Sequence, residues 1–537
     1  MANSYDVQAE ALRILEDCLL ADQRLALPPN VREACKKVKF FGDSKPFIPT
    51  PCKITESCAA LSALVGGLAS AVASARYGIE LQNIDIDTDK ATLFIMSVML
   101  PTVEGTSFLQ CKEIRAALSE ADIYNMDKPI HRQCTNVYKT KDDRWYHLHG
   151  SMNAGPTMRM LGVAEQDVTT EVAQKIYTEE VAKWDSTEIE KTANEQFLQA
   201  GTVCNTVEEF FASPHGKIMS EEPLYTSTPI KAPQMKWPSS EPGHKSLAGI
   251  KVLDFSRVIA APVASKLLAV LGADVLKLSY TGNPEIDILM VDMSTGKRDA
   301  NVNMKTEAGK AAFRSLVKDA DIVIDGFRPG ALEKLGFSSA ALREINPSLI
   351  YMRENCYGFK GPLADRSGWQ QISDCVVGIS WLQGKFLGLD EPVVPLLPNS
   401  DYQTGLIGAA AAIQALLART KSAVTFDIDF TLTQFNIWYY RLGQYDAEQS
   451  AALIARNPGF SVRHYDEMTS LLAKSYKGLQ VSRPGLIERE DFYVHMSGKE
   501  WGVGDMKVLK PPFDLEVSEL EWSVPSGIRG RSKPEWL

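Results

Sequence analysis

One carboxylate stands where an apolar, proline-containing approach meets a long alanine-rich segment. It is Asp401, in the stretch PLLPNSDYQTGLIGAAAAIQALLART that runs from Pro395 to Thr420. Aspartate is favoured at the N-termini of helices, where its side chain accepts hydrogen bonds from unpaired backbone N–H groups. The residue type and position therefore leave two interpretations open, a helix cap and a carboxylate that carries out chemistry.

A second group of candidate residues follows strand-like segments in the second half of the chain. The turn SRVIAAP (256–262) has no glycine, so it lacks the G-x-G-x-x-G pattern of dinucleotide-binding loops. It still directs the backbone N–H groups of a helix N-terminus, beside Arg257, toward an anionic ligand. Lys305, Phe327, Arg328 and Lys334 come after later strands. Their side chains suggest a rim of cations that collects phosphate groups, with Phe327 stacking on a base.

These residues need a parallel sheet to bring them together. The second half alternates strand-like segments (251–256, 274–279, 299–304, 321–327 and 348–353) with helix-like segments (262–273 and 306–320). Such alternation predicts βαβ units and a parallel sheet. Ligands of these sheets bind at the carboxyl ends of the strands, so we expect the candidate residues to lie along one edge.

The first half echoes the Asp401 region. Residues 47–87 and 394–429 share a proline-rich approach, a threonine early in the helix (Thr55 and Thr404), an alanine-rich helix and an exit strand ending in Asp-Ile-Asp. The shared flanks predict an internal duplication, and a chance likeness of two alanine-rich helices is the alternative. Cys52 stands opposite Asp401 in this alignment, so only the second copy would carry the carboxylate.

Size and composition exclude several classes of protein. The 537 residues predict two or three domains, and the net charge of −10 argues against a nucleic-acid or anionic-membrane surface. The apolar stretches 59–73 and 406–417 are short and rich in Ala and Gly, which predicts buried helices and no membrane span.

Cysteine and histidine usage points to a reduced, metal-free interior. Nine scattered cysteines form no CxxC pair, and the N-terminus does not read as a secretory signal, so we expect a cytoplasmic protein. His147 and His149 form an HxH pair without a third ligand in view. We therefore predict a structural role for these histidines and no metal.

Residues 246–440 resemble the N-terminal domain of class III CoA-transferases of the formyl-CoA:oxalate type. This superfamily also includes carnitine CoA-transferase and α-methylacyl-CoA racemase. The matching phrases are LAGIKVLDFSRVIAAPVASKLLAVLGADVLKL, NVNMKTEAGKAAF, ADIVIDGFRPGALEKLGFSSAALREINPSLIY, YGFKGPLADRSGW and LPNSDYQTGLIGAAAAIQALLAR. The first half resembles the family more weakly: TKDDRWYHLHGS is similar to the opening strand of its small domain, and FLQAGTVCNTVEEFFASP to its closing motif.

The resemblance implies a chemistry for Asp401. The family nucleophile maps onto this residue, which would attack an acyl-CoA thioester to form a mixed anhydride and then an aspartyl-CoA thioester. A carboxylate suffices because it is already ionised at neutral pH. The substrates implied are an acyl-CoA and a carboxylic acid acceptor, with CoA as part of the substrate and no permanently bound cofactor. The CoA contacts carried over from the family are Arg257, Val258, Ala260, Lys305, Phe327, Arg328 and Lys334.

The sequence departs from the family pattern at several positions. Trp369 and Gln370 stand where the racemase branch has a His–Asp pair and where many transferases have a Glu. Gly326 replaces a common Asn, and Ser279–Tyr280–Thr281 stand where an Arg is frequent. Two further functions therefore stay open: an acyl-CoA isomerase, racemase or lyase, and a non-catalytic CoA-binding descendant of the family.

The fold expected is α/β: a parallel, Rossmann-like sheet domain with flanking helices plus a smaller α+β domain. Family members form interlocked ring dimers, so a fused chain would either form a homodimer or complete the ring internally as a pseudo-dimer. The predicted organisation is a degenerate partial copy of the large domain (1–110), a small domain (111–220), a linker (221–247), the CoA-binding domain (248–440) and a C-terminal helical and wrapping segment (441–537).

Overall fold

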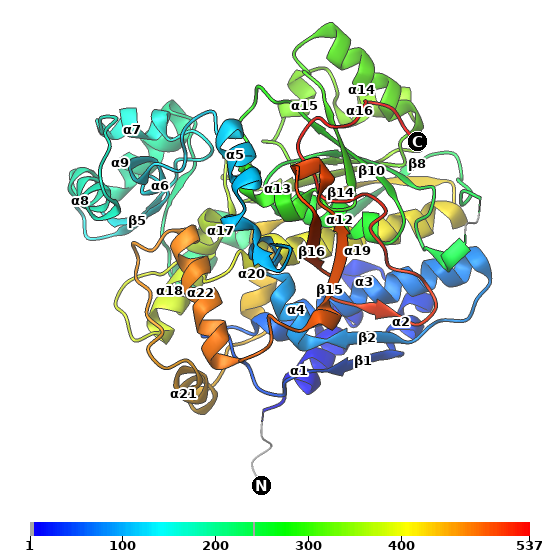
Figure 1. The fold of residues 1–537 in the computed structure, drawn as a ribbon, viewed down its shortest axis with the longest axis horizontal. Coiled ribbons are helices and arrows are strands. Elements are labelled where there is room, and N and C mark those ends of the chain that lie inside the picture. The colour runs from blue at the N-terminus through cyan, green and yellow to red at the C-terminus, as the bar shows by residue number, and fades with distance from the viewer. Residues whose placement is uncertain (1–4, 240–241) are drawn as a thin grey trace.

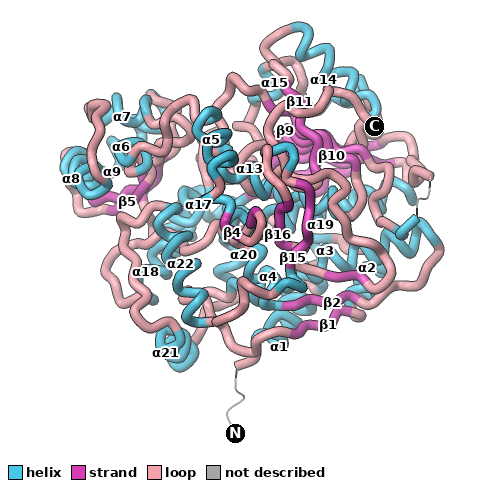
Figure 2. The backbone as a smooth tube through the Cα atoms, viewed as in Figure 1, coloured by secondary structure: helices cyan, strands magenta, loops and turns pink. Residues whose placement is uncertain are grey.

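A seven-stranded sheet forms the centre of the molecule (Figures 1 and 2). The computed structural model describes residues 5–239 and 242–537; residues 1–4 of the predicted partial copy and 240–241 of the predicted linker lie outside this description. The strand order is β11-β10-β9-β12-β13-β14-β8, parallel except for β8. The strands are β8 (Tyr225–Lys231), β9 (Lys251–Phe255), β10 (Asp274–Ser279), β11 (Lys297–Asn301), β12 (Ile322–Asp325), β13 (Ile350–Asn355) and β14 (Val424–Thr431).

The order of these strands reverses between β9 and β12. In open parallel sheets, ligands bind in the crevice at the carboxyl ends of the strands beside such a reversal. The loops that follow β9 and β12 carry Arg257, Phe327 and Arg328. The topology therefore places three of the predicted binding residues at the expected crevice.

Alternating side chains along the strands build two cores, one on each face of the sheet. Val252, Ile324 and Met352 face α3 (Ile54–Tyr77), α12 (Ala260–Val270) and α19 (Asn399–Lys421). Leu253 and Val323 face the layer that contains α14 (Glu307–Asp319), α15 (Ala331–Lys334) and α16 (Ser339–Ile345). The mixed α/β architecture expected from the sequence is present.

Helices α12 and α19 approach very closely. A Cβ atom at Gly405 would lie 2.4 Å from Val263 Cγ1 and 2.8 Å from the Ala260 carbonyl oxygen, so only glycine fits there. Helix α3 packs against α19. Although α3 is long and apolar enough to cross a membrane, 89% of its most apolar 18-residue window is buried inside the protein.

Each half of the chain adds a strand to the sheet of the other half. Strand β8 of the first half pairs antiparallel with β14, and β17 (Asp514–Leu515) pairs antiparallel with β2 (Ile84–Asp87). Strand β2 also pairs in parallel with β1 (Val38–Phe41). The segment 221–247 was predicted as a linker, but its first part is thus a strand of the main sheet.

The two regions predicted as copies have the same local order of elements. Helix α3 leads into β2 and α4 (Thr88–Phe94), and α19 leads into β14 and α20 (Leu432–Arg441). The internal duplication itself remains a prediction. The remaining α-helices of residues 5–100 are α1 (Val7–Arg13), which continues into a π-helix at Ile14–Leu20, and α2 (Pro29–Cys35).

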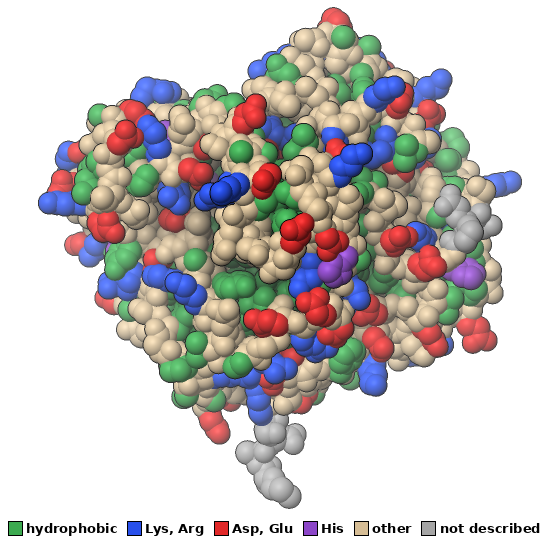
Figure 3. Space-filling view, in the orientation of Figure 1, with side chains coloured by type: hydrophobic (Ala, Val, Ile, Leu, Met, Phe, Trp, Pro, Cys, Tyr) green, Lys and Arg blue, Asp and Glu red, His purple; other side chains and the backbone are tan. Residues whose placement is uncertain are grey.

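A separate lobe, called the small lobe below, lies on the left in Figure 1, and a notch sets it apart in the outline of Figure 3. Its sheet joins β5 (Asn136–Lys139), β6 (Trp145–Leu148) and β7 (Gly201–Val203). Its helices are α6 (Pro129–Arg132), α7 (Gly155–Leu161), α8 (Thr170–Val181) and α9 (Ser186–Lys191).

The C-terminal segment contributes a small sheet as well as helices. The order is β15-β16-β3-β4, with β3 (Thr102–Val103), β4 (Thr106–Ser107), β15 (Tyr493–Ser497) and β16 (Asp505–Leu509). The other helices of at least six residues are α5 (Lys112–Ala121), α10 (Val207–Ala212), α11 (Pro214–Met219), α13 (Asp287–Met293), α17 (Gln370–Val377), α18 (Ile379–Phe386), α21 (Ala447–Arg456) and α22 (Met468–Ser482).

Candidate active site

Asp401 lies in the first turn of α19 and opens on a cavity of about 260 Å³, called the Asp401 cavity below. The helix begins at Asn399 and its N-cap is Pro398, so Asp401 is the third helical residue and not the cap. Its side chain is buried, at 8% exposure. The helix-cap interpretation is therefore wrong, and the carboxylate faces a space that a ligand can occupy.

The surroundings of Asp401 oppose a negative charge. Burial raises the pKa of Asp401 well above its usual range, and the nearby carboxyls of Glu354 and Asp374 raise it further. The N-terminal end of α19 acts in the other direction, because unpaired N–H groups in the first turn favour an anion. Asp374 is itself buried and accepts hydrogen bonds from Ser400 Oγ (2.9 Å) and Asn436 Nδ2 (2.8 Å).

The loop between β9 and α12 forms one wall of the Asp401 cavity. Arg257, Val258 and Ala260 all line it. Val258 has a φ of 71°, a left-handed conformation that is unusual for a β-branched residue. Such strain costs about 1–3 kcal/mol and persists only where the surroundings enforce it. The Val258 N–H donates to Glu285 Oε1 at 3.4 Å, and Glu285 pairs with the buried Lys277 at 3.2 Å.

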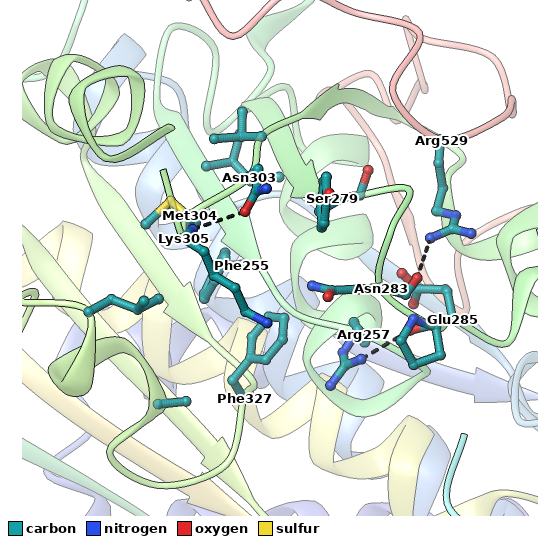
Figure 4. A pocket seen from close by; sticks show the side chains of 16 residues that line it. Phe255, Arg257, Ser279, Asn283, Glu285, Asn303, Met304, Lys305, Phe327 and Arg529 are labelled. Carbon is teal, nitrogen blue, oxygen red and sulfur yellow. Dashed lines mark hydrogen bonds between the residues drawn. The ribbon is translucent and has the colours of Figure 1, made fainter. Parts of the chain in front are cut away.

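A second cavity of about 160 Å³ adjoins the first and is shown in Figure 4; it is called the Lys305 cavity below. The two cavities share Arg257, Pro284 and Phe327, so they adjoin along these residues. The Phe327 ring stacks on Phe255 with 4.3 Å between centroids, and the Arg257 guanidinium lies 4.6 Å from the Phe327 centroid. Arg257 also donates to the Pro284 carbonyl at 3.0 Å.

The predicted cations divide between the two cavities. Arg257 lines both, Arg328 lines the Asp401 cavity and Lys305 lines the Lys305 cavity. Burial lowers the pKa of both Arg257 and Arg328. Lys334 is exposed at the end of α15 and lines neither cavity, so the predicted rim lacks its fourth member.

The residues that depart from the family pattern, Gly326, Trp369 and Gln370, lie in or beside the Asp401 cavity. A Cβ atom at Gly326 would lie 2.8 Å from Ser256 Cβ and 3.0 Å from Ala261 Cβ, so an Asn would not fit without movement. Trp369 lines the Asp401 cavity and donates to Ser151 Oγ at 3.3 Å. Gln370 instead donates to Asp374 and is buried away from the cavity lining.

Several lining residues were not identified from the sequence. Glu354 and Cys356 lie at the end of β13, and Arg366 follows in the next loop. Glu354 could have been found, because it comes directly after the predicted strand 348–353. The small lobe supplies Ser151, Met152, Asn153, Pro156 and Gln199, and the C-terminal segment supplies Arg529 to the Lys305 cavity.

The two histidines of the HxH pair are buried beside this site. Their rings are stacked with 5.7 Å between centroids, and His149 stacks in turn on Trp369 at 5.4 Å. Burial lowers the pKa of His147 to about 4 and that of His149 well below its usual value. Across residues 5–239 and 242–537, no group of three or more His, Cys, Asp or Glu side chains is arranged to hold a metal ion.

The sequence is similar to proteins named for transfer of CoA. Residues 247–457 match the model of CoA-transferase family III. The acetyl-coenzyme A transferase nodX of Hypoxylon pulicicidum is 34% identical, over 99% of this chain and 94% of that relative. An acyl-CoA transferase of Gibberella moniliformis is 28% identical, over 91% of this chain and 89% of its own length. The crystal structure of Rv3272 from M. tuberculosis aligns with 53% of this chain and 96% of that chain, at 22% identity and a TM-score of 0.40.

Proposed function

The chain belongs to CoA-transferase family III, and from this membership we propose that it moves CoA between carboxylic acids with Asp401 as the covalent nucleophile. The observation that supports this role most directly is the position of Asp401. Its carboxylate opens on a cavity that adjoins a second one, and the linings of the two include Arg257, Lys305 and Phe327. CoA is a long molecule with an anionic, aromatic end and a reactive thioester end, which suits two adjoining cavities of this composition.

In the proposed reaction, a carboxylate oxygen of Asp401 forms a bond to the thioester carbonyl carbon. The C–S bond then breaks, which leaves an aspartyl mixed anhydride and the CoA thiolate. The thiolate attacks the aspartyl carbonyl, releases the first carboxylate and gives aspartyl-CoA thioester. The acceptor carboxylate repeats the sequence in reverse, and Asp401 is regenerated as a carboxylate.

We propose that the acyl group is short. The Asp401 cavity measures about 260 Å³, just below the usual range of ligand pockets, and the end of the pantetheine arm has to share it. The relative nodX carries the name acetyl-coenzyme A transferase, which fits a small acyl group. A panel of CoA thioesters of increasing chain length is expected to show the highest kcat/KM for the shortest.

The test of the nucleophile is intact mass after incubation with acyl-CoA, with and without hydroxylamine. The wild-type chain is expected to gain a hydroxylamine-sensitive adduct that Asp401→Ala does not form. Incubation in deuterated water provides the alternative outcome. Exchange of the α-hydrogen without any adduct would favour an isomerase or lyase instead.

We also propose that one chain closes the ring that family members build from two. Strand β8 of the first half completes the sheet of the second, and β17 of the second half completes the sheet of the first. The Asp401 cavity likewise combines Ser151 and Met152 with residues of the second half. Native mass spectrometry is expected to find active particles with the mass of a single chain, whereas activity confined to a dimer would contradict the proposal.

A further inference from the structure

A second carboxyl group lines the same cavity as Asp401. Glu354 is the fifth residue of β13, where its backbone pairs with Phe430 of β14 in the parallel sheet. Its side chain lines the Asp401 cavity and also a neighbouring cavity of about 430 Å³ behind the β12 loop. Because the strand fixes its backbone, Glu354 is held beside the reaction centre more firmly than a loop residue would be.

The carboxyl group of Glu354 differs from those of Asp325 and Asp374 because it has no hydrogen-bond partner. Within the part of the chain that the structure describes, its side chain forms no hydrogen bond or ion pair. Asp325 accepts from Tyr351 Oη at 2.8 Å and from the Phe327 N–H at 3.1 Å, and Asp374 has three side-chain donors. A half-buried carboxylate without donors is costly, whereas a neutral carboxyl group has an O–H that needs an acceptor. A ligand in the cavity can provide that acceptor.

The charged groups around Glu354 come from several elements. Those that line the Asp401 cavity are Asp401, Cys356, Arg257, Arg328 and Arg366, of which Arg366 is paired with Glu190. Those that line the neighbouring cavity are Asp325, Glu333, Tyr351 and Arg353, of which Arg353 is paired with Asp429. Burial and the Asp325 carboxylate raise the pKa of Glu354 to about 8.

Two carboxyl groups in one cavity oppose each other's ionisation, so the titration of each depends on the other. The two positions are not equivalent. Asp401 lies in the first turn of the 23-residue helix α19, where the helix dipole favours an anion. Glu354 lies at the end of a strand and has no such support. The helix dipole therefore favours the charge on Asp401 and leaves the proton on Glu354.

We propose that Glu354 is a further catalytic residue of the transfer reaction, whose neutral carboxyl group donates a hydrogen bond to the acyl carbonyl oxygen that Asp401 attacks. This inference rests on the proposed transferase function. When the Asp401 oxygen adds to the carbonyl carbon, the negative charge moves to the carbonyl oxygen, and the hydrogen bond strengthens. When the C–S bond breaks, the charge leaves on the thiolate. The proton stays on Glu354 throughout.

The first test measures the single-turnover rate of adduct formation by mass spectrometry between pH 6 and pH 9.5. Glu354→Leu removes the donor, and we expect a rate loss of about 10²–10³-fold, the usual cost of one donor to a developing oxyanion. Glu354→Gln keeps an N–H donor, and we expect it to restore the rate at pH 6.5 to within about tenfold of wild type. Glu344→Gln, at an exposed carboxylate on α16 that lines neither of the two cavities beside Glu354, is the matched control and should leave the rate unchanged.

The pH profile distinguishes hydrogen-bond donation by Glu354 from a role of its side chain in packing alone. Wild-type adduct formation is expected to fall above about pH 8, because ionised Glu354 loses its donor and repels Asp401. Glu354→Gln should lack this falling limb. A Glu354→Leu variant as fast as wild type, or a limb that persists in Glu354→Gln, would overturn the proposal.

A second measurement works even if no transfer occurs. In unreactive Asp401→Asn protein, the ¹³C-labelled thioester carbonyl of bound acyl-CoA is followed by difference infrared spectroscopy. A hydrogen bond from Glu354 lowers the carbonyl stretching frequency, and the shift should disappear in Asp401→Asn/Glu354→Leu. Absence of the shift would refute the role of Glu354, whereas absence of an adduct in wild type would refute the transferase mechanism.

Discussion

Two long, buried, alanine-rich helices of this chain begin in opposite surroundings. Each carries a carboxylate as its third residue, Glu56 in α3 and Asp401 in α19. Glu56 is completely buried and accepts hydrogen bonds from Tyr5 Oη (2.7 Å) and Tyr445 Oη (2.9 Å). Asp401 forms no side-chain hydrogen bond to any of the described residues and opens on a cavity. The same position in a helix thus serves a closed polar network in one case and an open site in the other.

The comparison shows that burial and helix position do not make a carboxylate reactive. Burial raises the pKa of both groups. The hydroxyl groups of Tyr5 and Tyr445 donate hydrogen bonds to the carboxylate oxygens of Glu56. These hydrogen bonds occupy lone pairs that a nucleophile would need. No described residue donates a hydrogen bond to the carboxylate of Asp401, so its lone pairs are free for a ligand in the cavity. Access to an empty space is the property that separates the two.

The largest expected effect distinguishes the two carboxylates by activity. Asp401→Asn should slow CoA transfer by on the order of 10⁴-fold or more, because it removes the nucleophile itself. Glu56→Gln is the matched change at the other helix and should leave kcat within about twofold, since Glu56 is completely buried and lines neither the Asp401 cavity nor the Lys305 cavity. Steady-state transfer rates and adduct mass measure both. Comparable losses in the two variants would remove the functional distinction.

The next effect concerns stability, for which we expect the change at Glu56 to cost more than the change at Asp401. Glu56→Leu strands the hydroxyl groups of Tyr5 and Tyr445, and we expect it to lower the free energy of unfolding by about 2–4 kcal/mol. Asp401→Leu strands no donor and should cost less. Urea denaturation compares them. Tyr5→Phe/Tyr445→Phe in the Glu56→Leu background should recover part of the loss, and failure to recover any would mean that packing accounts for the cost.

Much of the second-half fold could be predicted from its sequence, for a specific reason. The parallel strands β9, β10 and β12 have apolar centres and alternate with helices that have clear ends, and their predicted and observed bounds differ by at most two residues. Strand β11 was predicted at 299–304 but spans Lys297–Asn301. Its first two residues are the cations Lys297 and Arg298, which are typical of an exposed segment. In the structure, Lys297 pairs with buried Asp254, and Arg298 pairs with Asp274.

Strand β8 was missed because it lies at the edge of the sheet. It contains Pro229, which an edge strand tolerates since it can face away from the ladder, and most of its residues are partly exposed. The alternation that identifies a central strand is therefore absent. Its partner β14 lies more than a third of the chain away in the sequence, so pairing with β8 depends on tertiary structure alone.

The candidate site likewise combines residues that could be predicted from local sequence with residues that distant segments contribute. Arg257, Val258 and Ala260 lie in one loop beside a strand end, so their convergence follows from the topology of a parallel sheet. Ser151 and Arg529 reach the two adjoining cavities from the small lobe and the C-terminal segment. No local pattern marks these residues, because their contribution depends on how distant segments pack.

A smaller effect concerns the cations beside each helix. Arg257 lines both cavities near the start of α19, and we expect Arg257→Ala to raise the Kd for CoA about tenfold, equivalent to about 1.4 kcal/mol. Lys53 directly precedes α3 and pairs with Glu10, so Lys53→Ala should leave CoA affinity unchanged. Isothermal titration with CoA measures both. Lys334→Ala, outside either cavity, is a second control, and a large effect there would place the phosphate site elsewhere.

The smallest expected effect is the pH dependence of stability that Asp401 contributes. Because burial raises the pKa of Asp401 in the folded protein, the folded state holds its proton to a higher pH than the unfolded state does. The contribution of Asp401 to stability is therefore fully present below its unfolded pKa and is lost as pH rises through its folded pKa. Asparagine does not titrate, so the stability of Asp401→Asn relative to wild type should increase as pH rises from about 4 toward neutrality. Melting temperatures of the two proteins across that range test this. A constant difference would mean that Asp401 ionises as freely in the cavity as in water, and burial would then have no part in the contrast between Asp401 and Glu56.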